Sequence, residues 1–175
     1  ERRSVSAPMQ KRIYIYDLTR NDTYPLIQAG DILGRDPVWS VDGSALAFYN
    51  TSNQGIMVYD FDAVAAGLDR GITLIPSQFG TSGALSPDGN QLVFPEIILS
   101  GQQVRAFLQV ADLTSMDLQR LTTPDEDAND RFAEWSPDGR YVAISRSFTG
   151  GENFTAGQQV YLLDTFDGSL DPLIN

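Results

Sequence analysis

The stretch AEWSPDGRYVAIS, residues 133–145, joins a tight-turn sequence to a run of apolar residues. Two related stretches occur earlier in the chain, VWSVDGSALAFY from Val38 and ALSPDGNQLVFP from Ala84. In S-P-D-G, proline presets φ, aspartate can bond back to the backbone, and glycine takes a positive φ that strains other residues. The three stretches therefore predict three similar strand–turn–strand units. The first turn is expected to be looser, because Val41 replaces the proline.

A second motif, largely apolar residues closed by aspartate, alternates with these turns. It reads IYIYD at 13–17, IMVYD at 56–60, LQVAD at 108–112 and VYLLD at 160–164. Short segments rich in β-branched and aromatic residues, bounded by Gly, Pro, Asp or Asn, are typical of strands. Helical periodicity is weak, and the one predicted helical turn lies near Asp62 to Leu68.

Four short strands that recur at spacings of 46 and 50 residues indicate a β-propeller. We therefore expect an all-β fold, a β-propeller of four-stranded antiparallel blades, with about three and a half blades present in this partial or open array. The predicted parts are a basic N-terminal arm at 1–12 and the blades at 13–175, with repeats near 37–75, 83–122 and 132–174 preceded by a half blade at 13–27.

Two sets of recurring side chains have structural interpretations. The large apolar residue before each turn serine is expected to end a strand and pack between neighbouring sheets; these residues are Trp39, Leu85 and Trp135. The aspartates that close the second motif could form a ring of carboxylates, but their recurrence in every repeat favours hydrogen bonds to turn amides; they are Asp17, Asp60, Asp112 and Asp164.

The order of W-S-P-D-G, apolar strand, aspartate-closed strand and RLT-like strand resembles the WD-like propeller repeats of TolB-type proteins. The third copy is the most similar, with LQRLTTPDEDANDRFAEWSPDGRYVAISRS at 118–147 followed by QVYLLD. The resemblance covers nearly all of residues 13–174. It implies a propeller that is usually extracytoplasmic (periplasmic or at the cell surface) and usually a platform for protein partners.

The resemblance thus implies a non-enzymatic interaction scaffold or assembly subunit. Similar repeats also form the propellers of prolyl-oligopeptidase-like enzymes, so a propeller domain of a larger hydrolase, with its catalytic domain outside these residues, stays open as the alternative. Closed propellers typically have four to eight blades. We therefore expect upstream residues, with a membrane anchor among them, or other subunits to complete the array.

Composition excludes several classes of function. The chain has 23 acidic and 12 basic residues and a net charge of −11, which opposes binding to nucleic acid or to anionic membranes. It contains no histidine and no cysteine, so it holds neither a Ser-His-Asp triad nor a thiolate or imidazole metal site. No apolar run approaches the roughly 18 residues of a membrane span. We expect no catalytic residue, no direct membrane insertion and a protein partner.

Two candidate sites remain. In PDEDAND, residues 124–130, Asp125, Asp127 and Asn129 alternate like the first ligands of a calcium loop, although Asp130 stands where such loops have glycine. Calcium is therefore the one cofactor considered. The predicted partner-binding loops are FTGGENFTAGQQ at 148–159, with Phe148 and Phe154 as contacts, and its counterpart ILSGQQVR at 98–105. Both are expected on the same side of the propeller.

Overall fold

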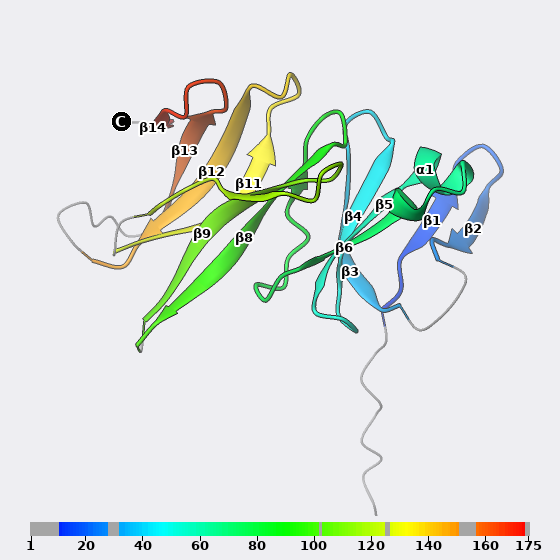
Figure 1. Ribbon diagram of the computed structural model, residues 1–175, viewed down its shortest axis with the longest axis horizontal. Helices are drawn as coiled ribbons and strands as arrows, with labels where there is room; N and C mark the ends of the chain where they lie inside the picture. The colour runs from blue at the N-terminus through cyan, green and yellow to red at the C-terminus, as the bar shows by residue number, and fades with distance from the viewer. Residues whose placement is uncertain (1–10, 28–31, 102, 125–126, 151–156, 174–175) are drawn as a thin grey trace, which may run out of the picture.

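The computed structural model describes residues 11–27, 32–101, 103–124, 127–150 and 157–173. Small antiparallel sheets lie side by side, one two-stranded and three four-stranded (Figure 1). The half blade is β1 (Tyr14–Asp17) and β2 (Asp22–Pro25); blade 1 is β3 (Gly34–Trp39), β4 (Ala45–Asn50), β5 (Gly55–Asp60) and β6 (Ile72–Pro76); blade 2 is β7 (Ala84–Leu85), β8 (Gln91–Ser100), β9 (Gln103–Asp112) and β10 (Leu118–Arg120); blade 3 is β11 (Ala128–Trp135), β12 (Tyr141–Phe148), β13 (Gln158–Asp164) and β14 (Leu170–Pro172). The prediction of an all-β, open propeller of three and a half blades is confirmed.

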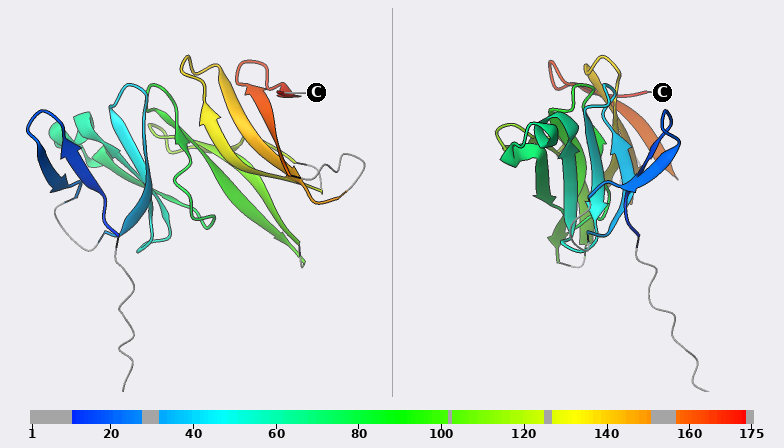
Figure 2. Two further views of the ribbon diagram at one scale, coloured as in Figure 1. Left: turned by 180° about the vertical axis from the view of Figure 1, so that it is seen from behind. Right: turned by 90° about the vertical axis from the view of Figure 1, so that its right-hand side faces the viewer.

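Within each blade the strands pair in chain order, so each sheet is a simple meander. Seen from behind, the sheets keep the same sequence from the half blade to blade 3 (Figure 2). The predicted helical turn is present between β5 and β6, as α1 (Phe61–Ala65) followed by a 3₁₀ turn at Asp69–Gly71. Asp60 caps α1 by accepting the amide of Ala63 at 2.8 Å. Neither helical segment is long or apolar enough to cross a bilayer, among the residues described.

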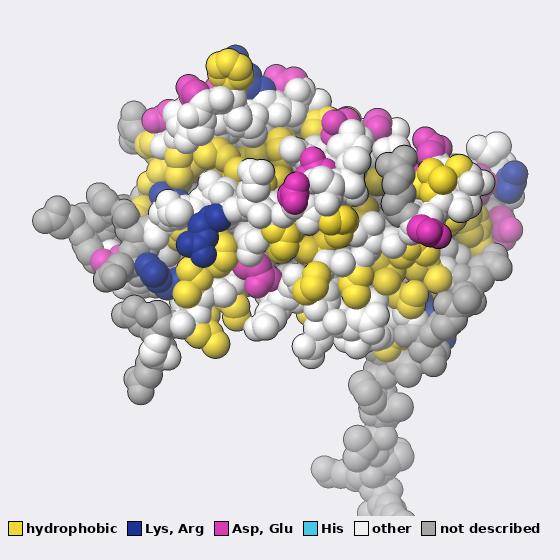
Figure 3. Space-filling model, in the orientation of Figure 1, with side chains coloured by type: hydrophobic (Ala, Val, Ile, Leu, Met, Phe, Trp, Pro, Cys, Tyr) yellow, Lys and Arg dark blue, Asp and Glu magenta, His cyan; other side chains and the backbone are white. Residues whose placement is uncertain are grey.

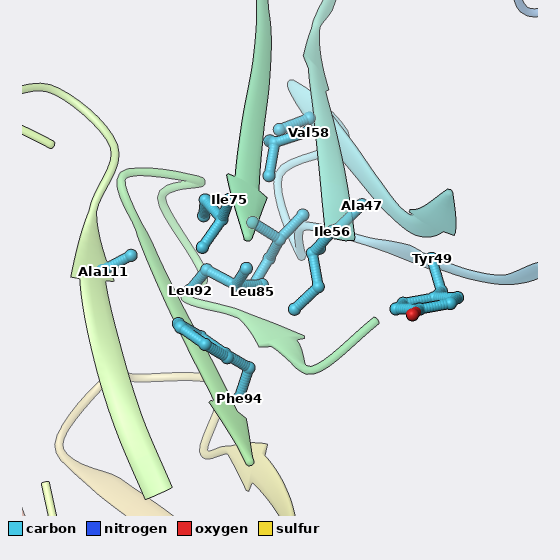
Figure 4. Packing of buried hydrophobic residues seen from close by; sticks show 10 residues of the cluster. Ala47, Tyr49, Ile56, Val58, Ile75, Leu85, Leu92, Phe94 and Ala111 are labelled. Atoms are coloured by element: carbon cyan, nitrogen blue, oxygen red, sulfur yellow. The ribbon is translucent and has the colours of Figure 1, made fainter. Parts of the chain in front are cut away.

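The core lies between neighbouring blades. Leu85 and Leu92 of blade 2 pack against Ile56 and Ile75 of blade 1 (Figure 4). The same arrangement recurs between blades 2 and 3 and between the half blade and blade 1. Because side chains alternate across a strand, each blade presents apolar residues to both neighbours. A blade therefore needs a neighbour on each side to bury its core.

The three Asp-Gly turns share one hydrogen-bond pattern. In the third, Ser136 Oγ donates to Asp138 at 2.5 Å and accepts the amide of Tyr141 at 2.9 Å. The amide of Gly139 donates to the carbonyl of Ser136 at 2.9 Å, with a glycine φ of 73°. The corresponding serine–aspartate distances are 2.7 Å and 2.6 Å in the first and second turns. The expected looser first turn is therefore not observed: the polar contacts, rather than the proline, fix the bend.

These contacts stabilise the charged form of the turn aspartates. Backbone donation from Ser44 lowers the pKa of Asp42, and the serine hydroxyls lower the pKa of Asp88 and Asp138. The strand-closing aspartates bind turn amides, as predicted: Asp112, for example, accepts from Thr114 and Ser115 at 2.8 Å each. The same kind of donation lowers the pKa of Asp17 and Asp112.

Trp39 departs from its predicted position. Leu85 and Trp135 are buried between blades, but Trp39 is 49% exposed. Trp135 packs on the innermost strand of the blade before it, where its Nε1 donates to the carbonyl of Ala84 at 3.2 Å. The half blade before Trp39 has two strands in the described part of the chain and offers no such inner strand. Trp39 stacks instead on Phe61, with ring centroids 5.3 Å apart.

Candidate binding surface

The segment predicted as a loop at 98–105 is the end of a long hairpin. β8 and β9 are ten residues each and pair along their whole length, from Gln91 opposite Asp112 to Ser100 opposite Gln103. The corresponding strands of blade 1 have six residues each. The loop prediction was wrong because the apolar segment continues past residue 97 and Gly101, with a φ of 62°, permits a tight turn.

The tip of this hairpin is apolar and exposed. Leu99 and Val104 lie opposite one another in register and are 69% and 56% exposed. The hairpin projects at the lower left in Figure 1, and hydrophobic side chains are visible over it in the space-filling view (Figure 3). We call this pair the hairpin tip.

The base of the hairpin is held firmly. The amide of Ala106 donates to Asn129 Oδ1 of blade 3 at 2.7 Å. The guanidinium of Arg120 lies 4.1 Å from the ring centroid of Phe107. The hairpin tip is therefore an apolar protrusion on a rigid support.

The second predicted loop joins β12 to β13, and Phe154 lies outside the described residues. Phe148 is the last residue of β12, opposite Ala128, and is half-buried. Two residues earlier in β12, the guanidinium of Arg146 donates to the carboxylate of Asp130 in β11, at 2.7 and 2.9 Å. The Asp130 carboxylate is fully buried. This connection and the hairpin tip occupy the same place in the blade meander, between the second and third strands. The role of Phe148 and Phe154 in partner binding stays a prediction.

A concavity of about 510 Å³ lies where three blades approach one another. The side chains of Phe132 and Val160 are exposed on the face of blade 3 that has no neighbouring blade among the described residues. A register shift between Asp130 and Phe132 interrupts β11 there. The lining also includes the charged residues Asp36, Arg131 and Glu134. The sequence did not reveal this surface, because its residues come from distant repeats.

The calcium candidates are placed as follows. Asn129 lies within β11 and is buried, with its Oδ1 accepting the Ala106 amide. Asp127 lies just before β11, and its backbone carbonyl accepts the amide of Thr149 at 2.7 Å. Asp125 is outside the described residues. Within the described ranges no three acidic, histidine or cysteine side chains cluster as a metal site would require, and calcium binding stays a prediction.

No protein-family model matches the sequence, and no curated protein is significantly similar to it in sequence. Solved structures share the fold. TolB from Acinetobacter baumannii is 22% identical, with a TM-score of 0.56, over 91% of this chain and 36% of that chain. The tricorn protease has a TM-score of 0.63 at 14% identity, over 88% and 16%. Dipeptidyl peptidase 4 from Porphyromonas gingivalis has a TM-score of 0.64 at 14% identity, over 92% and 28%.

These likenesses confirm the resemblance to TolB-type propellers at the level of fold. The chain spans 36% or less of the length of each of these three proteins. Both TolB and peptidases appear among the similar structures, so the shared fold does not distinguish a binding module from part of an enzyme.

Proposed function

We propose that this chain is a non-enzymatic, TolB-like propeller that binds a protein partner outside the cytoplasm, as a scaffold or assembly subunit. The observation that carries the proposal is the hairpin tip, Leu99 opposite Val104 on a hairpin longer than its counterpart in blade 1.

Scattered exposed apolar residues are ordinary on a protein surface. Here two such side chains are adjacent, on strands that extend beyond the blade, and are more than half exposed. Burying a valine or leucine side chain contributes about 1.5–3 kcal/mol, which the hairpin tip gains only against another molecule. A net charge of −11 adds attraction for a partner with a basic surface.

The proposal is tested with the double variant Leu99→Ser/Val104→Ser. A partner is first identified by cross-linking to the wild-type protein, and its dissociation constant is then measured for each variant. We expect binding to weaken about 100-fold, since both apolar side chains lose their burial.

The matched control is Val41→Ser/Leu118→Ser. It removes two exposed apolar side chains, 65% and 51% exposed, that lie away from the hairpin tip in the chain. The control should bind like the wild type. Equal binding by the hairpin-tip variant and the wild type would refute the role of the hairpin tip.

A second candidate is the propeller domain of a larger prolyl-oligopeptidase-like hydrolase. It is favoured by the likeness to peptidase structures, with TM-scores of 0.63 and 0.64. This chain has no histidine, so a Ser-His-Asp relay would have to come from outside these residues. Labelling of the full-length gene product by a serine-directed fluorophosphonate would support this candidate against the scaffold.

A further inference from the structure

The half blade lacks, among the described residues, the pairing that every other blade makes. In blades 1, 2 and 3 the aspartate-closed strand is the third strand and pairs with the second: β5 with β4, β9 with β8 and β13 with β12. β1 carries the same motif and pairs with β2 on one side. Its other edge has no strand beside it in the described ranges.

The backbone of β1 directs hydrogen-bonding groups toward that open edge. Tyr14 lies opposite Pro25, which has no amide hydrogen, whereas the amide of Leu26 donates to the carbonyl of Ile13 at 3.0 Å. Hydrogen-bonded and non-hydrogen-bonded pairs alternate along an antiparallel ladder. The amides and carbonyls of Tyr14 and Tyr16 therefore point away from β2, toward the open edge.

Trp39 marks the place of an inner strand. Its equivalent Trp135 is 9% exposed and donates to the carbonyl of Ala84, in the innermost strand of the preceding blade. Trp39 is 49% exposed, and its indole nitrogen makes no hydrogen bond to any residue the structure describes. An inner strand beside the half blade would give Trp39 both the burial and the acceptor.

Leu18 gives a third, independent indication. In blades 1, 2 and 3 the residue after the closing aspartate donates its amide to the residue after the turn glycine. These bonds are Phe61 to Ser44 at 3.0 Å, Leu113 to Asn90 at 2.9 Å and Thr165 to Arg140 at 2.9 Å. Leu18 follows Asp17 in the same way and is 87% exposed. An S-P-D-G turn beside β1 would offer the amide of Leu18 the same kind of acceptor, the carbonyl that follows the turn glycine.

We infer that the open edge of β1, together with Trp39 and Leu18, binds a two-stranded hairpin of this same repeat. The first strand of the hairpin ends in a large apolar residue before an S-P-D-G turn and presents its backbone to Trp39. The second strand carries the apolar triplet and pairs antiparallel with β1. The strand pairing and the amide bond after the closing aspartate recur in the three sheets already formed, and the tryptophan bond is made between blades 2 and 3. The inference is independent of the hairpin tip.

The probe is a synthetic peptide with the sequence of residues 128–148, the inner hairpin of blade 3, in which leucine replaces Trp135. Leucine is acceptable because Leu85 fills this position in blade 2. Hydrogen exchange of the wild-type protein reports on the amides of Tyr14 and Tyr16. In a Trp135→Phe background Trp39 is the single tryptophan, because the sequence has two, and its fluorescence reports burial.

We expect saturable binding, slower exchange at Tyr14 and Tyr16, and a blue shift of Trp39 emission. A scrambled peptide of the same composition should produce none of these. Since a free hairpin loses conformational entropy on binding, the same sequence is also fused ahead of residue 1 through a Gly–Ser linker. No protection of β1 and no shift in either format would overturn the inference.

Two proline variants test the edge itself. Tyr16 and Thr23 are opposite one another in the register, on the two strands of the half blade. Tyr16→Pro removes a donor from the open edge and should weaken peptide binding about tenfold or more. Thr23→Pro alters the opposite edge of the same ribbon and should leave binding unchanged. If instead the wild-type protein is a dimer that Tyr16→Pro converts to a monomer, the edge binds a second copy and the inference is wrong.

Discussion

The indole nitrogen of Trp135 donates to the carbonyl of Ala84 at 3.2 Å, across the boundary between blades 2 and 3. Trp39, at the same repeat position, has no such bond among the described residues and stacks on Phe61. One residue type at one repeat position therefore has two environments, which are set by the preceding blade. The contrast permits a matched test.

Trp135→Phe should lower the free energy of unfolding by about 1–3 kcal/mol, because it removes an inter-blade hydrogen bond and leaves space in the core. Trp39→Phe should cost less than about 1 kcal/mol, because the side chain is half exposed and a phenyl ring can still stack on Phe61. Urea unfolding of both variants measures the difference. Equal losses would show that the blade boundary does not determine the contribution of the tryptophan.

The local features were predictable from the sequence. Each S-x-D-G turn is fixed by contacts within five residues, such as Ser86 to Asp88 and to the amide of Gln91. The exposure of Trp39 depends on what lies beside it in space, and its own repeat does not encode that. The length of the β8–β9 hairpin was missed because S-G-Q-Q is typical of a loop, whereas pairing of Leu99 with Val104 extends the ladder. The concavity was beyond prediction because it joins Asp36 to Val160.

Removing one partner of the Asp130–Arg146 ion pair should lower the free energy of unfolding strongly. The carboxylate is fully buried and receives two contacts of 2.7 and 2.9 Å from the guanidinium. Arg146→Met leaves this buried charge uncompensated and should lower the free energy of unfolding by about 3–5 kcal/mol. The double variant Asp130→Ala/Arg146→Met should recover part of that loss, as urea unfolding would reveal. The single variant Asp130→Ala completes the comparison: a double variant whose loss equals the sum of the two single losses would contradict direct coupling of the pair.

The turn aspartates should make the fold sensitive to acid. Serine hydroxyls and backbone amides lower the folded-state pKa of Asp42, Asp88 and Asp138 below the ordinary value of 3.8. A group with a lowered folded pKa stabilises the fold above its unfolded pKa, and this contribution is lost as pH falls through the folded value. The free energy of unfolding should therefore be steady with respect to these groups near pH 6 and decrease below about pH 4.

The measurement is urea unfolding between pH 6 and pH 2.5. The matched variant carries asparagine at positions 42, 88 and 138, which keeps a side-chain oxygen and removes the titration. Its free energy of unfolding should fall less steeply with acid than that of the wild type. Parallel curves would mean that other carboxylates, such as Asp17 and Asp112, account for the acid sensitivity.

Alanine substitutions at Gly83 and Gly101 distinguish the cost of an unfavourable backbone conformation from the cost of a steric clash. Both have positive φ, 72° and 62°. A Cβ on Gly83 would lie 2.3 Å from the carbonyl oxygen of Val93 and 2.9 Å from Cβ of Phe94, whereas one on Gly101 would meet nothing within 4 Å. Gly101→Ala should cost about 1–2 kcal/mol, the conformational penalty alone. Gly83→Ala should cost about 2–5 kcal/mol, because the clash is with backbone in the adjoining strand β8 and adds overpacking to that penalty. Denaturant unfolding of the two variants measures both losses of unfolding free energy. Equal costs would mean that the segment leading into β7 can move away from β8, and that the inner edge of blade 2 is not closely packed.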